Sequence, residues 1–241
     1  MISKENLLGE IVKGDFKTAS IFESLGIDYF CGGSRSLEKV CNEKNINVDE
    51  VIEKLNTTYI NKNGSGLFDV MELDILIEHI INVHHSYINK MIPEINKHAL
   101  KVLNTHGKNH PELEELTVLW QNLAEELENH LLKEERMLFP YIKSLVETKK
   151  DSLSVPFAPF GSVGNPISVM EKEHLSAGNS FARIHEITSD YTLPEDACST
   201  YAVLYDELKD FEKDLHMHIH LENNILHPKA IMLEYELTNK K

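Results

Sequence analysis

The chain has 241 residues, of which 41% are hydrophobic and 26% charged, so it can bury one sizeable core and a small second domain. Its formal net charge of −15 argues against nucleic acid and anionic membranes as main partners, because both bind patches of Lys and Arg. No apolar run approaches the roughly 18 residues of a membrane helix. The start of the chain lacks a secretory signal, and three widely spaced cysteines do not suggest a disulfide scaffold, so we expect a cytoplasmic protein.

Residues 1–57 have the pattern of a small domain built from short helices. Asp15 and Ser36 are expected N-caps, and Gly26 is expected to end a helix. Residues 58–68 contain the run Asn-Lys-Asn-Gly-Ser-Gly, which predicts a flexible linker. We expect the small domain to dock a client protein, to contact the rest of the chain or to mediate a homodimer.

Residues 69–236 carry four long helical patterns and no convincing strand pattern. Four consecutive long helices predict an all-α fold with an antiparallel four-helix bundle. Prolines that suit a first helical turn mark the start of three of these helices, at Pro111, Pro166 and Pro194. The four patterns run over about 69–104, 112–147, 165–189 and 194–236.

One motif occurs twice, over residues 130–140 and 218–228, with histidine, glutamate and proline at the same spacing in both copies. In each copy the histidine and the glutamate stand at i and i+4, so they share one helix face. The glutamates, Glu134 and Glu222, fall on the apolar stripe of their helix. A buried carboxylate is costly unless a positive charge balances it, and a metal ion would supply that charge. The prolines are expected to kink or end their helices.

The other two helices each place one histidine on their apolar stripe. The expected metal ligands are therefore four imidazoles and two carboxylates: His85, His130, Glu134, His174, His218 and Glu222. Nitrogen and oxygen ligands without thiolate suit iron or manganese, with zinc as an alternative. If both glutamates bridge two ions, each ion keeps an open position for a small ligand.

Most of the 13 histidines are expected to lie outside the metal site. Nine are interpreted as non-ligands: His79, His84, His98, His106, His110, His185, His216, His220 and His227. Among these, His220 and His227 are the ones for which a ligand role stays most open, because they lie close to the second His–Glu pair.

The helix motifs 130–140, 166–174 and 218–228 resemble the repair-of-iron-centres family, of the ScdA/YtfE type, which carries a hemerythrin-like di-iron domain. Residues 25–33 are similar to the small domain at the front of that family. The resemblance implies a non-haem centre of two iron ions, with room for a bridging oxygen, held by the same six ligands. It also implies that the protein repairs iron–sulfur proteins damaged by nitric oxide or oxidants by supplying iron.

The resemblance extends to acidic positions near the metal site, which fall here on Glu126 and Glu173. They could orient imidazoles or guide leaving iron, and the alternative is that they are plain surface acids. The chain departs from the family at Phe30, where a first of two adjacent cysteines is common. Cys31 remains as a reactive thiol or as a structural residue.

Cys41 and Cys198 are both expected to be buried filler, since a free cysteine is among the most buried residue types. Two further classes of function stay open. The bundle could carry or sense dioxygen or nitric oxide without transferring iron. It could also reduce nitric oxide or consume peroxide at the metal centre, although the sequence shows no obvious proton relay or electron entry point. Whether the protein is an enzyme therefore stays undecided.

Overall fold

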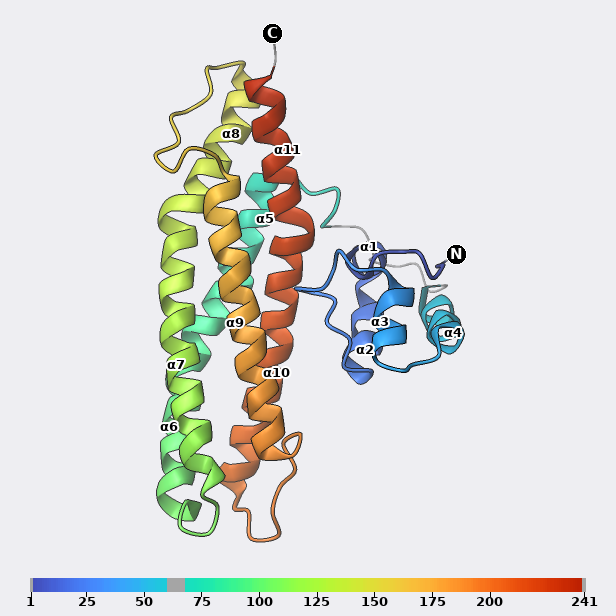
Figure 1. Ribbon diagram of the computed structural model, residues 1–241. Coiled ribbons are helices and arrows are strands. Elements are labelled where there is room, and N and C mark those ends of the chain that lie inside the picture. The colour runs from blue at the N-terminus through green and yellow to red at the C-terminus, as the bar shows by residue number, and fades with distance from the viewer. Residues whose placement is uncertain (1, 60–67, 240–241) are drawn as a thin grey trace. The chain divides into compact units, whose positions relative to one another are not determined.

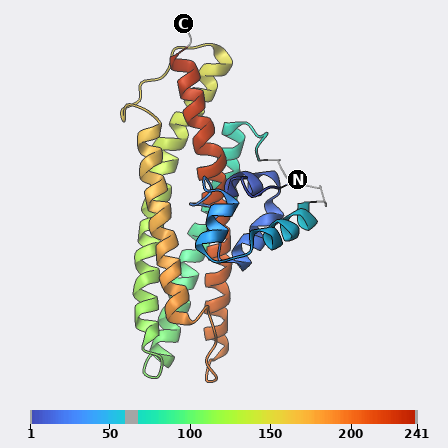
Figure 2. The same cartoon turned by 45° about the vertical axis from the view of Figure 1, so that its right-hand side comes forward.

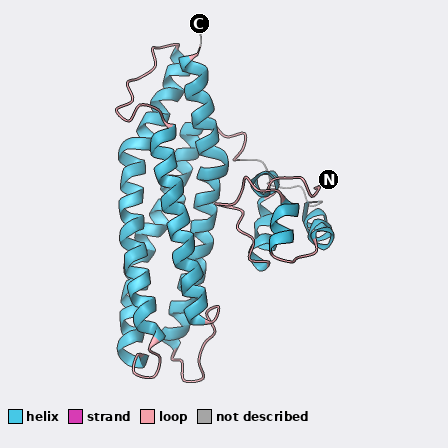
Figure 3. Cartoon of the chain, viewed as in Figure 1, coloured by secondary structure: helices cyan, strands magenta, loops and turns pink. Residues whose placement is uncertain are grey.

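The structure is a computed structural model that describes residues 2–59 and 68–239. This part of the chain is helical and contains no β-strand (Figure 3), which confirms the predicted all-α fold. No helix in it is long and apolar enough to cross a bilayer. The chain forms two compact units, one made of Met1–Ile77, Leu145–Pro156 and Met217–Lys241, and the other of Glu78–Ser144 and Phe157–His216.

The unit Glu78–Ser144 with Phe157–His216 is built from the long helices α6 (Ser86–His106), α7 (Glu112–Lys133), α9 (Gly164–Thr188) and the greater part of α10 (Ser199–Leu221). Helix α7 packs against both α6 and α9, and loops reverse the chain between α6 and α7 and between α9 and α10 (Figure 1).

Helix α10 closes this bundle through polar and aromatic contacts. His98 on α6 lies 2.7 Å from Glu207 on α10. The aromatic core joins three helices, because the Phe211 ring lies 4.9 Å from Trp120 and 6.3 Å from Phe181, centroid to centroid. The predicted four-helix bundle is thereby formed from the expected apolar stripes.

The other unit contains the short helices α1 (Leu8–Gly14), α2 (Ala19–Ser24), α3 (Leu37–Glu43) and α4 (Val48–Tyr59), with a 3-10 turn, η1 (Phe16–Thr18). It also contains most of α5 (Leu73–His79) and the helix α11 (His227–Thr238), which is the red helix in Figure 2. Its apolar core includes five side chains at 0% exposure: Leu8, Phe22, Tyr29, Leu37 and Leu55. The predicted division into a small domain (1–57), a linker (58–68) and a bundle (69–236) stays a prediction, and 60–67 of that linker lie outside the described residues.

Several helix ends follow the sequence signals. The Asp15 carboxylate accepts the backbone N–H of Lys17, and the Ser36 hydroxyl accepts that of Lys39, so both predicted caps are confirmed. Gly26 follows α2 with φ of 59°, a left-handed conformation that glycine adopts without strain.

The prediction that the last long helix opens at Pro194 is wrong by five residues. A turn follows Pro194, whose carbonyl accepts the N–H of Ala197 at 3.1 Å. The helix begins only at Ser199, because the Cys198 carbonyl accepts the first helical N–H groups. Because of this turn, the helix starts after Cys198 rather than at Pro194.

Neither proline of the repeated motif ends its helix. A π-helical turn precedes each one: η3 (Glu134–Leu138) leads into α8 (Phe139–Asp151), and η4 (Glu222–Leu226) leads into α11. The N–H of Phe139 bonds to the carbonyl of Glu134, five residues back, and His227 bonds to Glu222 in the same way. The wider turn accommodates the missing N–H of the following proline, so the helix continues.

Candidate metal centre

Glu134 lies between two histidines in the bundle. Its two carboxylate oxygens lie 3.4 Å from His85 Nε2 and 3.3 Å from His130 Nε2. The Nε2 atom of His174 lies 3.0 Å from that of His130. All four side chains are at most 2% exposed. The π turn η2 (Ile80–His85), α7, the π turn η3 and α9 therefore bring four of the six predicted ligands together in a buried place.

The remaining two predicted ligands form a pair on one helix. His218 Nε2 lies 3.0 Å from a carboxylate oxygen of Glu222, and both side chains are 0% exposed. Two groups of four residues each offer ligand atoms within 4.8 Å of one another: His85, Glu134, His218 and Glu222, and His130, Glu134, His174 and Glu222. The two glutamates are members of both groups, while each histidine belongs to one.

Three of these residues stand at the edge of a π-helical turn. His85 ends η2 (Ile80–His85), Glu134 begins η3 and Glu222 begins η4. Single π turns within α-helices are rare and are frequent at functional sites. The extra residue of η2 changes the direction in which His85, at its end, points, and those of η3 and η4 rotate the residues that follow Glu134 and Glu222.

The donor set fits a bound cation. Glu134 and Glu222 are completely buried, and stripping water from a carboxylate is costly unless a positive charge balances it. The ligand atoms of the two groups are imidazole nitrogens and carboxylate oxygens, with no thiolate among them. Such a set suits iron, manganese or zinc.

Two further carboxylates contact the outer nitrogens of the histidines. Glu173 lies 2.9 Å from His130 Nδ1, and Glu135 lies 2.8 Å from His85 Nδ1. The hydrogen bond with His130, together with Lys133, lowers the pKa of Glu173 to about 2, so this carboxyl stays ionised. Hydrogen bonds of this kind fix the orientation of a metal-ligating imidazole.

Glu173 contacts a predicted ligand, as a residue that orients imidazoles would, whereas Glu126 is exposed and accepts a hydrogen bond from Ser176 at 3.3 Å. Sequence reasoning missed Glu135. Its neighbour Glu134 points into the core, and consecutive helical residues diverge by about 100°, so nothing in the pattern placed Glu135 beside a ligand.

Residues 76–230 match the hemerythrin HHE cation binding domain family, which is more than half of the chain. The chain belongs to this family. Residues 4–59 match a second family, ScdA_N, described as a domain of unknown function (DUF542). The cation-binding description agrees with the buried cluster of imidazoles and carboxylates.

Three relatives illustrate how far the similarity extends. The iron-sulfur cluster repair protein ScdA of Staphylococcus epidermidis is 29% identical over 236 residues, which cover 95% of this chain and 100% of that protein. The iron-sulfur cluster repair protein YtfE of an Enterobacter species is 32% identical over 234 residues, covering 96% and 99%. A probable iron-sulfur cluster repair protein of Haemophilus influenzae is 34% identical over 213 residues, covering 88% and 90%.

In the ScdA_N segment, Cys31 is half-buried, and its N–H donates to the Asp28 carboxylate at 2.9 Å. The amide of Asn224, two residues after Glu222, donates to the carbonyls of Tyr29 and Phe30 at 3.3 and 3.2 Å. The loop that carries Cys31 is therefore attached to the π turn η4.

The other two cysteines differ from each other. Cys41 is 0% exposed, which confirms its prediction. Cys198 is only half-buried, so the prediction that it is buried filler is wrong. Its position before α10 exposes it to the imidazole of His106 and to the N–H of Tyr201, whose hydrogen bonds lower the pKa of the thiol to about 7.

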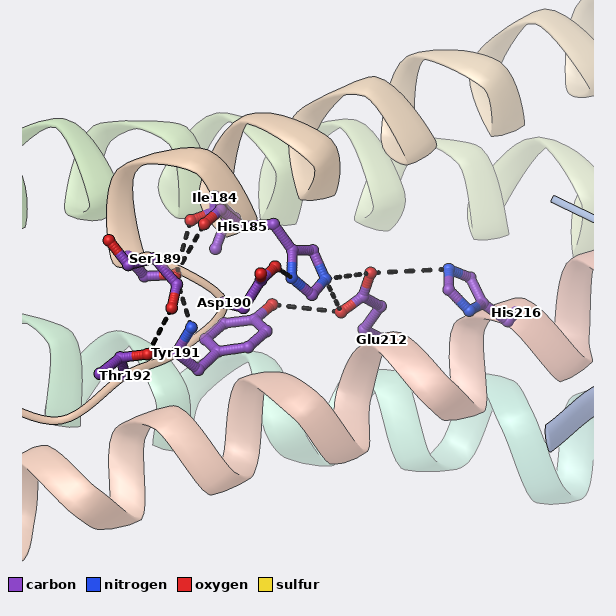
Figure 4. Close-up of polar contacts among 9 residues, drawn as sticks. Ile184, His185, Ser189, Asp190, Tyr191, Thr192, Glu212 and His216 are labelled. Atoms are coloured by element: carbon purple, nitrogen blue, oxygen red, sulfur yellow. Dashed lines mark hydrogen bonds and ion pairs between the residues drawn. The ribbon is translucent and has the colours of Figure 1, made fainter. Parts of the chain in front are cut away.

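Many of the histidines interpreted as non-ligands pair with carboxylates. His84 lies 3.1 Å from Asp214, and His185 on α9 lies 2.9 Å from Glu212 on α10. Figure 4 shows Glu212 between His185 and His216, with the hydroxyl of Tyr191 on the same carboxylate.

Two histidines close to the second His–Glu pair along the chain, His220 and His227, are buried. His220 Nδ1 lies 3.0 Å from the Asn224 amide, and burial lowers the pKa of this imidazole to about 4. His220 therefore contacts the segment that attaches the Cys31 loop.

Proposed function

We propose that this chain is a non-haem di-iron protein that repairs damaged iron–sulfur clusters by donating iron. The observation that carries the proposal is the pair of ligand groups that share Glu134 and Glu222, which suits two neighbouring ions. The names of the relatives support the repair role, since two are called iron-sulfur cluster repair proteins and the third a probable one.

The first ion would be held by His85 and His218, the second by His130 and His174, and both by the two glutamates. Bound ferrous ions supply the iron that a damaged cluster has lost. The residues of the chain hold the cargo in a buried place, keep the imidazole lone pairs directed inward and balance the charge with two carboxylates. Two carboxylates and two imidazoles leave each ion short of six ligands, which favours exchange.

The clients would be proteins whose iron–sulfur clusters have been damaged by nitric oxide or oxidants in the cytoplasm. We further propose that residues 1–57 are a separate domain that docks these clients, contacts the bundle or mediates a homodimer. Glu126 and Glu173 would assist the centre from outside, as groups that orient imidazoles or guide leaving iron. Cys31 would act in this domain as a reactive thiol, with a structural role as the alternative.

The test mixes anaerobic iron-loaded protein with a dehydratase whose cluster has been destroyed by nitric oxide. We expect more activity to return than with the same amount of free ferrous iron. The variant Glu222→Gln should lose the gain, because a neutral amide balances no metal charge, while the exposed Glu128→Gln should keep it.

Equal recovery with free ferrous iron would refute the repair role. Reversible dioxygen or nitric oxide binding without iron transfer would then favour a carrier or sensor. Nitrous oxide formed in a single turnover would favour reduction of nitric oxide.

A further inference from the structure

We propose that Glu135 is a positioning residue that fixes the tautomer and orientation of His85 and thereby strengthens metal binding there. The inference rests on the proposed metal centre but not on the repair of clusters. It assigns a role to the carboxylate that follows a predicted ligand in the chain.

Two consecutive glutamates contact the two nitrogens of one imidazole. Glu134 lies 3.4 Å from His85 Nε2, and Glu135 lies 2.8 Å from His85 Nδ1. Both nitrogens face a carboxylate, and the shorter contact, from Nδ1 to Glu135, favours the tautomer in which Nδ1 carries the proton and donates a hydrogen bond to Glu135. The lone pair of Nε2 is then left to face Glu134 and any cation beside it.

The segment that carries these glutamates also packs an aromatic ring against the face of the His85 imidazole. The Phe139 ring stacks on His85 with centroids 5.6 Å apart and an interplanar angle of 21°. His85 is 1% exposed, whereas the Glu135 side chain is 37% exposed. Glu135 therefore reaches the imidazole from the surface side, while Glu134 reaches it from the core.

The same arrangement recurs at a second predicted ligand. His130 Nε2 faces Glu134, and its Nδ1 lies 2.9 Å from Glu173. Glu173 comes from another helix, α9, whereas Glu135 comes from the helix that carries Glu134 itself. His85 and His130, the two imidazoles that lie 3.3–3.4 Å from Glu134, thus each have a carboxylate on the outer nitrogen, as metal-ligating histidines commonly do.

The first test observes the tautomer directly in metal-free protein labelled with nitrogen-15 in histidine. Nuclear magnetic resonance is recorded at a pH above the ordinary titration range of histidine, and the His85 signal is assigned with His85→Gln. We expect the wild type to hold its proton on Nδ1. Glu135→Ala should move His85 to a mixture of tautomers, while Glu128→Gln, an exposed change on α7, should not.

The second test measures the affinity for cobalt(II) by competition with a chelator, using the visible absorption of the bound ion as the signature. We expect Glu135→Ala to weaken binding about 10- to 100-fold. Glu135→Gln keeps an acceptor oxygen but loses the charge, so it should fall between the alanine variant and the wild type. Glu128→Gln should bind as the wild type does.

An unchanged His85 tautomer together with unchanged cobalt affinity in Glu135→Ala would overturn the proposal. Should the alanine variant fail to fold, Glu135→Gln carries the test, and an affinity equal to that of Glu128→Gln would overturn it. Neither readout involves cluster repair, so a failed repair assay leaves this inference standing.

Discussion

At the scale of single residues, the surroundings of Cys41 and Cys198 give their thiols different pKa values. Cys41 is buried, and desolvation raises the pKa of its thiol. Cys198 is half-buried, and the hydrogen bond from His106 lowers the pKa of its thiol to about 7. The thiolate is the nucleophile, so reactivity follows the pKa and the exposure rather than the residue type.

We therefore expect iodoacetamide to label Cys198 well before Cys41 at neutral pH. His106→Gln should slow the labelling of Cys198 roughly tenfold, because the imidazole is the largest cause of the lowered pKa. Mass spectrometry of timed digests measures both rates, with Cys198→Ser as the control. Equal labelling of Cys198 and Cys41 in the folded protein would contradict this expectation.

At the scale of elements, the backbone of the ScdA_N segment lies close to the side chain of Asn224 on the π turn η4. The N–H of Gly9 donates to the Gly33 carbonyl at 2.9 Å. A Cβ at Gly33 would collide with the Asn224 side chain and would lie 2.9 Å from the Tyr29 carbonyl oxygen. Only a residue without a side chain fits there, so this glycine is needed for packing.

Gly33→Ala should destabilise this contact by about 1–3 kcal/mol, because the added methyl group overpacks a closed site. The matched control is Gly164→Ala, whose Cβ would meet nothing nearer than 3.8 Å at the start of α9. Thermal unfolding of both variants, with hydrogen exchange at Gly9, measures the effect. A Gly33→Ala protein as stable as the control would show that the contact does not form in solution.

At the scale of the bundle, α10 is tied to other parts of its unit by histidine–carboxylate pairs. On α9, the hydrogen bond with Glu212, and then that with Asp190, raises the pKa of His185 above its ordinary value of 6.5. A raised pKa means that the folded state binds the proton more tightly than the unfolded state. The stability from this pair is complete below the ordinary pKa and is lost as pH rises through the raised one.

Metal-free protein should consequently lose stability as pH increases across this window, and His185→Gln should lose less. The expected difference is a fraction of a kcal/mol, because the His185 side chain is 35% exposed and solvent screens the pair. Chemical denaturation at a series of pH values, wild type against variant, measures it. A variant whose stability falls as steeply with pH as the wild type would rule out His185 as the source.

The six predicted ligands could be chosen from sequence because their signal is periodic. An i,i+4 pair on an apolar stripe defines a helix face before any fold is known, and the motif occurs twice. The helix ends were less predictable. Pro194 looks like a first-turn residue, yet a turn intervenes and Cys198 provides the first acceptor. The π turns could not be predicted from the apolar pattern, since a one-residue insertion changes the direction of the side chains without interrupting the helix.

By itself the sequence determined the helical class, the apolar stripes and the histidines and glutamates that lie on them, because local periodicity decides which side chains share a face. The tertiary structure alone decided which distant groups complete the contacts: Glu135 on His85, Glu173 on His130 and His106 on Cys198. These contacts depend on how separate helices rotate and pack against each other. No spacing within one helix encodes that rotation.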